Sequence, residues 1–306
     1  MPSMSLPDSV VAAARVIEQD LVSGAHDLAR RATQALAEAV ADAPSDDAKE
    51  LVDTLRLSAA TLARLRPAMS AIGNATAEAF HRVERALVDG VTPRATAERV
   101  IADYLRELDS AFAETVRQVA AVVPADRTVA TISFSRTVVD ALTAALPARV
   151  AVAESRPVLE GRETARLLAE AGIEVIVLSD AVAPGFVREC GLVLIGADAV
   201  LADGAVVNKV GSYPMALAAR AAAVPLYAAC ESLKICPLHT MPPEMHPGAE
   251  LWEAPPAGVA VRNPYFEVVA AELVTGIVTE RGVMAPHEAA HVAAAKRTAL
   301  RTIGAS

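Results

Sequence analysis

The sequence predicts an α/β protein in two parts, a helical domain over residues 1–122 followed by a Rossmann-like domain over residues 123–306. Two observations support this division. Apolar residues recur at helical spacing through the first part. After Val123 and Pro124, short β-forming runs alternate with helical runs. Such alternation is typical of parallel strands joined by right-handed crossovers, so the second domain is predicted to be a three-layer α/β/α structure with a mostly parallel sheet.

The helical part is predicted from apolar spacing and from signals at helix ends. Val10 and Ile17 belong to one apolar stripe, which continues at helical spacing beyond them. A later helix is expected over residues 74–89, with Asn74 as its N-cap. The next is expected over residues 92–119, because Pro93 suits the first position of a helix.

The second part is predicted from short apolar runs bounded by turn residues. Strands are expected at 128–133, 150–154, 175–179, 192–196, 225–229 and 258–261. Helices are expected at 136–145, 161–171, 182–189, 213–223 and 267–280. The glycine fingerprints of phosphate loops and dinucleotide sites are missing, so no obligatory NAD or ATP cofactor is predicted.

Composition narrows the class of protein. The chain has 306 residues, of which 53% are hydrophobic, and its net charge of −9 without a basic run argues against nucleic-acid binding. No apolar run approaches the roughly 20 residues of a membrane helix, and no basic segment with an apolar core opens the sequence, so a cytoplasmic protein is expected. The three cysteines match no zinc spacing and are expected to be free thiols.

Polar side chains follow the predicted strands where open α/β sheets bind small ligands. Asp198 comes directly after the strand at 192–196, and Asn208 and Lys209 follow within the next loop. Their convergence on one edge predicts a ligand site. The alternative is that Asp198 caps a helix and Asn208 lies in a turn.

Four cations are predicted on this same edge of the sheet, namely Arg136, Arg156, Lys209 and Lys234. Their natural counterpart is an anion, most plausibly a phosphate ester. The alternative for an arginine such as Arg156 is an ion network on the surface with Glu154, Glu160 or Asp180.

Several motifs resemble the initiation factor 2B alpha/beta/delta family, which also contains methylthioribose-1-phosphate isomerase and ribose-1,5-bisphosphate isomerase. The motifs are Glu154-Ser155-Arg156-Pro157, Gly196-Ala197-Asp198, Asn208-Lys209-Val210-Gly211-Ser212 and Glu231-Ser232-Leu233-Lys234. They occur in order over nearly the whole chain. The resemblance implies the two-domain fold described above, a phosphorylated sugar or nucleotide as ligand, and a homodimer joined through the C-terminal domain.

The resemblance also implies roles for single residues. Asp198 corresponds to the catalytic aspartate of the isomerases, and Arg156, Asn208 and Lys209 correspond to residues that hold the sugar and its phosphate. Gly24 and Ala25 match a ligand-binding motif, although Ser23 replaces its phosphate-binding arginine.

The largest departure from the isomerases is Ser133, which stands where they carry the catalytic cysteine. A serine hydroxyl is a much weaker acid than a thiol and needs an adjacent base. Cys230, at the end of another predicted strand, is the candidate for a replacement thiol. The sequence therefore favours a ligand-sensing, regulatory phosphate-binding protein, with an aldose-ketose isomerase of a phosphorylated ribose that uses Asp198 as the alternative.

Overall fold

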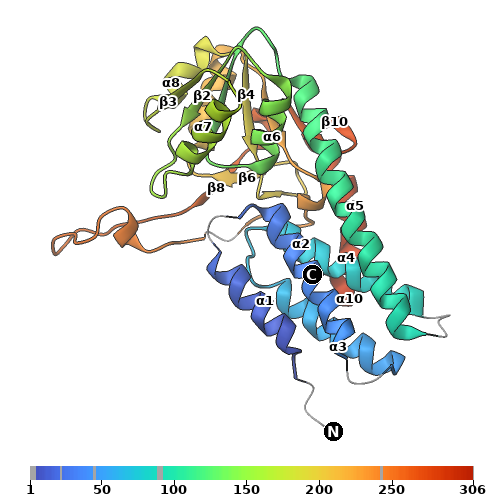
Figure 1. Ribbon diagram of the computed structural model, residues 1–306. Helices are drawn as coiled ribbons and strands as arrows, with labels where there is room; N and C mark the ends of the chain where they lie inside the picture. The colour runs from blue at the N-terminus through green and yellow to red at the C-terminus, as the bar shows by residue number, and fades with distance from the viewer. Residues whose placement is uncertain (1–4, 21–22, 44–45, 88–91, 242–243, 306) are drawn as a thin grey trace. The chain divides into compact units, whose positions relative to one another are not determined.

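The structure is a computed structural model that describes residues 5–20, 23–43, 46–87, 92–241 and 244–305 (Figure 1). The chain divides into two compact units. The first comprises Met1–Phe112, Leu233–Pro237 and His291–Ser306, and the second comprises Ala113–Ser232 and Leu238–Ala290. Each unit is thus assembled from separate stretches of the chain.

The first unit is helical, as its apolar spacing predicts. Its helices are α1 (Asp8–Gln19), α2 (Ala25–Ala41), α3 (Ala48–Leu62), α4 (Ser70–Ala86), the first part of α5 (Pro93–Val122) and most of α10 (Ala289–Thr302). Alanine recurs on the buried faces of both α2 and α4, which pack against each other. Small side chains let the two helix backbones approach closely. Pro93 opens α5 as expected.

Asn74 is not the N-cap of its helix, because α4 begins four residues earlier at Ser70. The side chain is buried and its Nδ2 donates hydrogen bonds to the backbone carbonyls of Leu233 at 2.6 Å and Ile235 at 2.9 Å. Ser70 Oγ donates to the carbonyl of Lys234 at 2.6 Å. These side chains therefore fix the segment Leu233–Pro237 within the first unit. The predicted end of the helix, at Asp89, lies outside the described residues.

The second unit is built on a seven-stranded sheet of order β10-β9-β7-β4-β1-β2-β3. Its strands are β1 (Thr128–Ile132), β2 (Arg149–Ala153), β3 (Val175–Leu178), β4 (Leu192–Gly196), β7 (Leu226–Ala229), β9 (Gly276–Thr279) and β10 (Gly282–Met284). All neighbouring strands are parallel except β9 and β10. This confirms the predicted fold class.

Helices cover the sheet in two groups. They are α6 (Arg136–Ala145), α7 (Glu160–Glu170), α8 (Ala183–Phe186) and α9 (Ser212–Ala222). Helix α6 packs against α7, and α8 packs against α9 (Figure 1). Apolar side chains of β1, β2, β4, α6 and α7 share one buried core, in which Val129, Val152 and Leu194 are fully buried. The run Leu192–Gly196 is buried throughout because β4 lies near the middle of the sheet.

The region after β7 differs from the prediction. Residues 258–261, of which the first three are exposed and Val261 is half-buried, form no strand. The helix expected at 267–280 is replaced by β8 (Phe266–Val269), a short 3-10 turn and β9. Strand β9 is rich in β-branched residues, which favour strands, and short apolar runs do not distinguish helix from strand by periodicity. Strands β5 (Ala199–Val200), β6 (Val206–Lys209) and β8 form a second, small sheet.

Short 3-10 turns connect several elements, at η2 (Val187–Glu189), η3 (Ser232–Lys234), η4 (Gly248–Glu250), η5 (Ala271–Leu273) and η6 (Pro286–Glu288). In the part of the chain that the structure describes, no helix has the length and apolar character needed to cross a membrane.

Candidate functional site

Three candidate residues follow neighbouring strands at one edge of the large sheet. Strand β4 lies between β1 and β7, with Leu192 paired to Val129 and Gly196 paired to Ala229. Continuing these ladders places Ser133 opposite Gly196 and Cys230 opposite Ala197, with Asp198 one residue further along the chain. Neighbouring strands lie about 4.8 Å apart. Ser133, Asp198 and Cys230 therefore follow three neighbouring strands at one edge of the sheet.

These three residues differ in their access to solvent. Asp198 and Ser133 are half-buried, whereas Cys230 is fully buried. The Asp198 N–H donates to the carbonyl of Val207 at 2.9 Å, which ties the end of β4 to the small sheet. Among the described residues no side chain hydrogen-bonds the Ser133 hydroxyl, so no neighbouring base activates it.

The loops after β1 and β2 are held in an unusual backbone conformation. Ser133 and Ser155 have φ values of 65° and 66°, in the left-handed region that non-glycine residues rarely adopt. Ser155 Oγ accepts from Ser133 N at 2.8 Å, and Asp180 accepts from the N–H groups of Ser155 at 2.8 Å and Arg156 at 2.7 Å. Thr164 Oγ1 donates to the Ser133 carbonyl at 2.7 Å. Backbone strain of this kind persists where surrounding contacts enforce it and clusters at functional sites.

Gly196 allows two polar side chains to come close to the end of β4. A Cβ atom at this position would lie 2.8 Å from Ser135 Cβ and Oγ, and 3.7 Å from Asn208 Oδ1. Asn208 is itself held by Ser212, whose Oγ accepts from Asn208 Nδ2 at 2.8 Å. Any larger residue at position 196 would displace this arrangement.

Lys209 is buried and fully partnered. Its side chain is 2% exposed, and Nζ lies 2.8 Å from Glu160 Oε1 and 4.1 Å from the centre of the Tyr265 ring. Tyr265 stacks on His246 with ring centres 3.4 Å apart, and its hydroxyl donates to Glu250 at 2.5 Å. Burial, followed by the Glu250 hydrogen bond and nearby carboxylates, raises the pKa of Tyr265, so its phenol stays neutral. The Lys209 ammonium thus connects β6 to the start of α7 through its ion pair with Glu160, which also neutralises its charge.

Arg156 is exposed, and among the described residues no carboxylate pairs with its guanidinium. The three carboxylates considered as its partners are engaged elsewhere. Glu154 binds Arg162 at 2.9 Å, Glu160 binds Lys209, and Asp180 accepts the two backbone N–H groups. The surface network considered for Arg156 is therefore not formed, and its charge remains available to a ligand.

The other predicted ligand-binding residues are distributed over the two units. Arg136 is exposed at the start of α6 and pairs with Asp140 one turn further on, at 2.8 Å. Gly24 precedes α2 and Ala25 is its first residue, so both belong to the first unit. Lys234 is buried and also belongs to the first unit. The second unit by itself therefore contains Arg136, Arg156, Asn208 and Lys209, together with the three catalytic candidates.

Sequence reasoning did not assign the residues that support the site. Glu267 Oε1 accepts from the N–H groups of Gly211 at 2.6 Å and Tyr213 at 2.8 Å, at the N-terminus of α9, where a negative charge is favourable. Glu160 and Tyr265 contact Lys209 from segments that are distant from it in the chain. Only the pairing of β6 with β8, which sets Asn208 opposite Glu267, brings these segments together. Among the described residues no group of three or more His, Cys, Asp or Glu side chains is arranged to hold a metal ion.

Comparison with known proteins agrees with this architecture. The chain is 30% identical over 277 residues to a ribose 1,5-bisphosphate isomerase of Haloferax volcanii, which covers 87% of this chain and 85% of the relative. It is 36% identical over 249 residues to a methylthioribose-1-phosphate isomerase of Gemmatimonas aurantiaca, which covers 74% and 71%. The crystal structure of the translation initiation factor eIF-2B of Pyrococcus horikoshii matches with a TM-score of 0.78 at 28% identity, over 92% of this chain and 98% of that chain.

A family-wide match covers most of the sequence, including every candidate residue of the second unit. Residues 21–286 match the family described as the initiation factor 2 subunit family. This confirms the resemblance on which the assignment of Asp198 and its neighbours rests. The chain belongs to the initiation factor 2 subunit family.

Proposed function

We propose that this chain is an aldose-ketose isomerase that acts on a phosphorylated ribose at the carboxyl edge of the large sheet. The observation that carries the proposal is the placement of Ser133, Asp198 and Cys230 after the ends of the neighbouring strands β1, β4 and β7. The sequence alone favours a regulatory sensor. The two isomerase relatives, each of which spans more than two thirds of the chain, support the isomerase better.

Asp198 is the residue proposed to move the proton. In a ring-closed aldose 1-phosphate the C1–O4 bond breaks and O4 takes up a proton, while the C2 hydroxyl loses its proton as C2 becomes a carbonyl. The hydrogen on C2 is transferred to C1, so the sugar is isomerised without an external oxidant or reductant. A carboxyl group beside O4 and the C2 hydroxyl can carry out both proton transfers. The backbone hydrogen bond from Asp198 to Val207 fixes the loop that presents this carboxylate.

Ser133 is proposed to donate a hydrogen bond to a sugar oxygen rather than to exchange a proton. Among the described residues no base is hydrogen-bonded to its hydroxyl, and the hydroxyl is a far weaker acid than a thiol with a pKa near 8.5. The fully buried Cys230 is less accessible than Ser133. We therefore expect turnover slower than that of enzymes with a cysteine at the position of Ser133.

Arg156 is proposed to bind the phosphate. Its guanidinium is exposed and not neutralised by any described carboxylate, and a planar guanidinium suits bidentate contact with phosphate oxygens. Lys209, by contrast, is proposed to position the site through Glu160. Replacing Arg156 by alanine should remove about 1.5 to 3 kcal/mol of binding free energy, which weakens binding tenfold or more.

The test is to follow ribose 1,5-bisphosphate and methylthioribose 1-phosphate by proton NMR with purified protein. Conversion that disappears in Asp198→Asn supports the isomerase. Binding of either sugar, or of a nucleoside monophosphate, without any conversion supports the regulatory sensor. Conversion that persists in Asp198→Asn but is lost in Cys230→Ala would show that the thiol carries the reaction.

Position 133 offers a gain-of-function test. Ser133→Cys should raise turnover about tenfold or more, because general acid-base groups act best with a pKa near the working pH. Ser135→Cys is the matched control, since it adds a thiol to the same loop at the start of α6. Equal turnover in wild type and Ser133→Cys would contradict the assigned role of this position.

We also propose that the chain forms a homodimer through the second unit. The support is the exposed apolar side chains that this unit carries, among them Leu217 on α9 and Trp252, which an interface between two copies would cover. Light scattering at micromolar concentration tests this, and a monomer would contradict it.

A further inference from the structure

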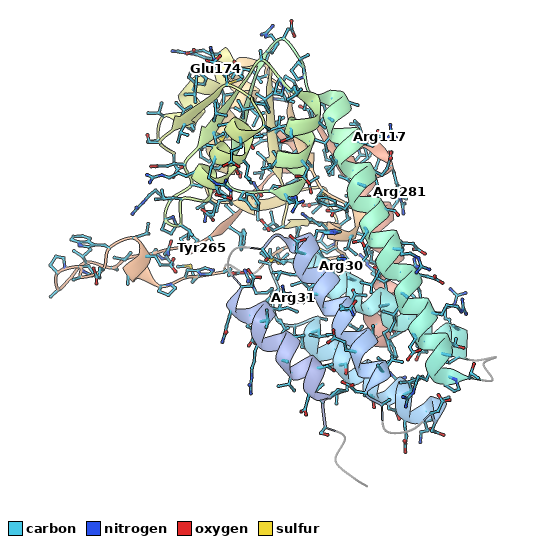
Figure 2. The ribbon with its side chains drawn as sticks, viewed as in Figure 1. Arg30, Arg31, Arg117, Glu174, Tyr265 and Arg281 are labelled. Atoms are coloured by element: carbon cyan, nitrogen blue, oxygen red, sulfur yellow. The ribbon has the colours of Figure 1, made fainter. Side chains whose placement is uncertain are left out.

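Residues 244–264 form an arm that extends from the second unit (Figure 1). Its base is well anchored: His246 N donates to the Asn263 carbonyl at 2.9 Å, and Tyr265 N donates to the Glu244 carbonyl at 3.2 Å. Figure 2 shows Tyr265 at this base. Beyond the base, every residue from 251 to 260 is exposed. The base of the arm is therefore fixed by hydrogen bonds, whereas its tip makes little contact with the rest of the chain.

The tip of the arm is apolar and nearly uncharged. It carries the only tryptophan of the sequence, Trp252, which is 50% exposed, together with exposed Leu251 and Val259. Glu253 is the only charged residue between positions 251 and 261. Apolar exposure of this kind on an ordered segment marks a contact surface.

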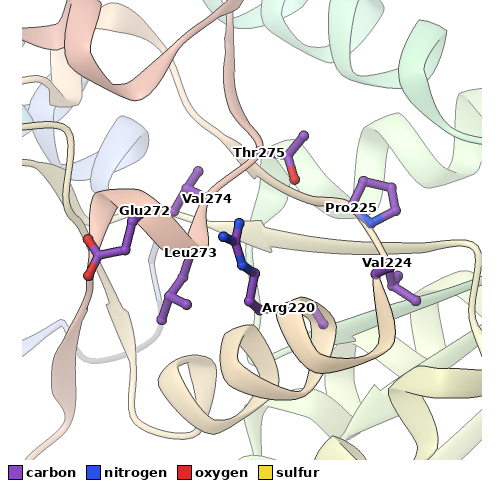
Figure 3. Close-up of a pocket in the computed structure, with 9 residues that line it drawn as sticks. Arg220, Val224, Pro225, Glu272, Leu273, Val274 and Thr275 are labelled. Atoms are coloured by element: carbon purple, nitrogen blue, oxygen red, sulfur yellow. The ribbon is translucent and has the colours of Figure 1, made fainter.

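A pocket of about 300 Å³ lies elsewhere on the second unit (Figure 3). It is formed by the last turn of α9, the chain leading into β7 and the chain between η5 and β9, so it lies at the opposite end of the strands from Asp198. Its walls include Val224, Pro225, Leu273 and Val274, and Arg220 extends across it. Glu272 also lines the pocket, but no described carboxylate forms an ion pair with the Arg220 guanidinium. The pocket therefore combines apolar walls with one carboxylate and one unpaired guanidinium.

An exposed stripe on α9 leads to this pocket. Tyr213, Leu217 and Arg220 are spaced four and three residues apart, which places them on one face of the helix. Tyr213 is 40% exposed and Leu217 is 44% exposed. Arg220 belongs both to this stripe and to the lining of the pocket, so the two features meet at its side chain.

The arm tip and the α9 surface are complementary in size and charge. A pocket of about 300 Å³ has the volume of about ten water molecules, and an indole ring has a comparable number of non-hydrogen atoms. In Leu251-Trp252-Glu253 the indole stands next to a carboxylate, as the apolar pocket wall stands next to Arg220. Because the chain has a net charge of −9, two copies repel each other except where a contact is neutral or opposite in charge. The arm tip satisfies that condition.

We propose that the arm of one copy docks on α9 of a second copy, with Trp252 in the pocket and Glu253 paired with Arg220. A two-fold axis makes the contact twice, since each copy supplies one arm and one pocket. The inference rests on the homodimer proposed above and names its contact surface.

Charge reversal tests the contact directly. Arg220→Glu and Glu253→Arg should each weaken dimerisation at least tenfold in sedimentation velocity, and the double variant Arg220→Glu with Glu253→Arg should restore most of it. Arg188→Glu is the matched control, because Arg188 is an exposed arginine of the same unit outside the pocket. Restoration by the double variant also excludes misfolding as the cause of the single effects.

The single tryptophan supplies a second readout. As the wild-type concentration rises through the dimerisation range, Trp252 emission should move to shorter wavelength, and in Arg220→Glu it should stay at the wavelength of exposed indole. A monomeric wild type, single variants that dimerise as well as Arg188→Glu, or a dimer with unchanged emission would each overturn the proposal. Turnover of the sugar phosphates is measured on the same samples, because the residues proposed for isomerisation lie at the other edge of the sheet. A failure of the dimer contact can then be told apart from a failure of the proposed isomerase.

Discussion

Replacing Glu160 by glutamine removes the negative charge that faces the buried Lys209 ammonium, and we expect a loss of about 2 to 3 kcal/mol in unfolding free energy. The two groups lie 2.8 Å apart, with the side chain of Lys209 2% exposed and that of Glu160 22% exposed. In the variant, the ammonium stays in the protein interior without an opposite charge.

The expected size follows from the surroundings of the pair. Breaking a fully buried ion pair costs about 3 to 5 kcal/mol, and breaking an exposed pair costs about 0 to 1 kcal/mol. Glu160 keeps some contact with water, and the Tyr265 ring at 4.1 Å still attracts the ammonium, so the value falls between these limits. Adding Lys209→Met to Glu160→Gln should recover part of the loss, because a neutral pair leaves no buried charge.

Equilibrium urea unfolding, followed by circular dichroism at one protein concentration, measures the effect. Glu163→Gln is the matched control on the same helix, since Glu163 pairs with Arg166 and both side chains are about half exposed. The control should change stability by less than about 1 kcal/mol. If Glu160→Gln and Glu163→Gln shift the transition equally, the argument that burial makes the Lys209 pair important is wrong.

Three further outcomes are expected. Gly161→Ala should lower the melting temperature, because the added Cβ would lie 1.9 Å from the Ala153 carbonyl oxygen. Gly185→Ala is the control, since no atom lies within 4 Å of the added Cβ there, and equal melting temperatures of the two variants would refute the argument. Asn74→Ala should cost about 1 to 3 kcal/mol, since two buried carbonyls lose their donor, and an unchanged urea midpoint would contradict it. Burial and a nearby carboxylate raise the pKa of Cys190 from 9.0 to about 11. Because the folded state holds the thiol proton more tightly than the unfolded state, the free energy of unfolding should fall between about pH 9 and 11. Cys190→Ala should make that decline smaller in urea titrations at these pH values.

The position of the site could be predicted from the sequence because it depends on local pattern. The apolar run Leu192–Gly196 had to be a buried strand, and Asp198 follows it directly. Once strands alternate with helices, their carboxyl ends share one edge, so Ser133 and Cys230 are placed there by topology alone. The fold and the neighbourhood of Asp198 therefore required no information about distant pairings.

The state of each charged group could not be predicted, because it depends on contacts between segments far apart in the chain. Lys209 and Glu160 are 49 positions apart, and nothing local distinguishes this buried lysine from the exposed, available Arg156. The sequence predicts a helix at 267–280, and the structure differs there for a related reason. Its apolar runs form strands because they pair with the edges of β6 and β7. The residue propensities of the segment alone do not predict this pairing.

The interleaving of the two units limits how the chain can be divided. A polypeptide ended after residue 122 would contain Ser70 and Asn74 but not Leu233–Pro237, whose carbonyls accept their hydrogen bonds. It would also lack residues 291–306, which belong to the same unit. The Ser70 hydroxyl and the Asn74 carboxamide would then have no protein acceptors in place of these carbonyls, so a split of the chain at residue 122 leaves the helical unit incomplete unless the second part is supplied in trans.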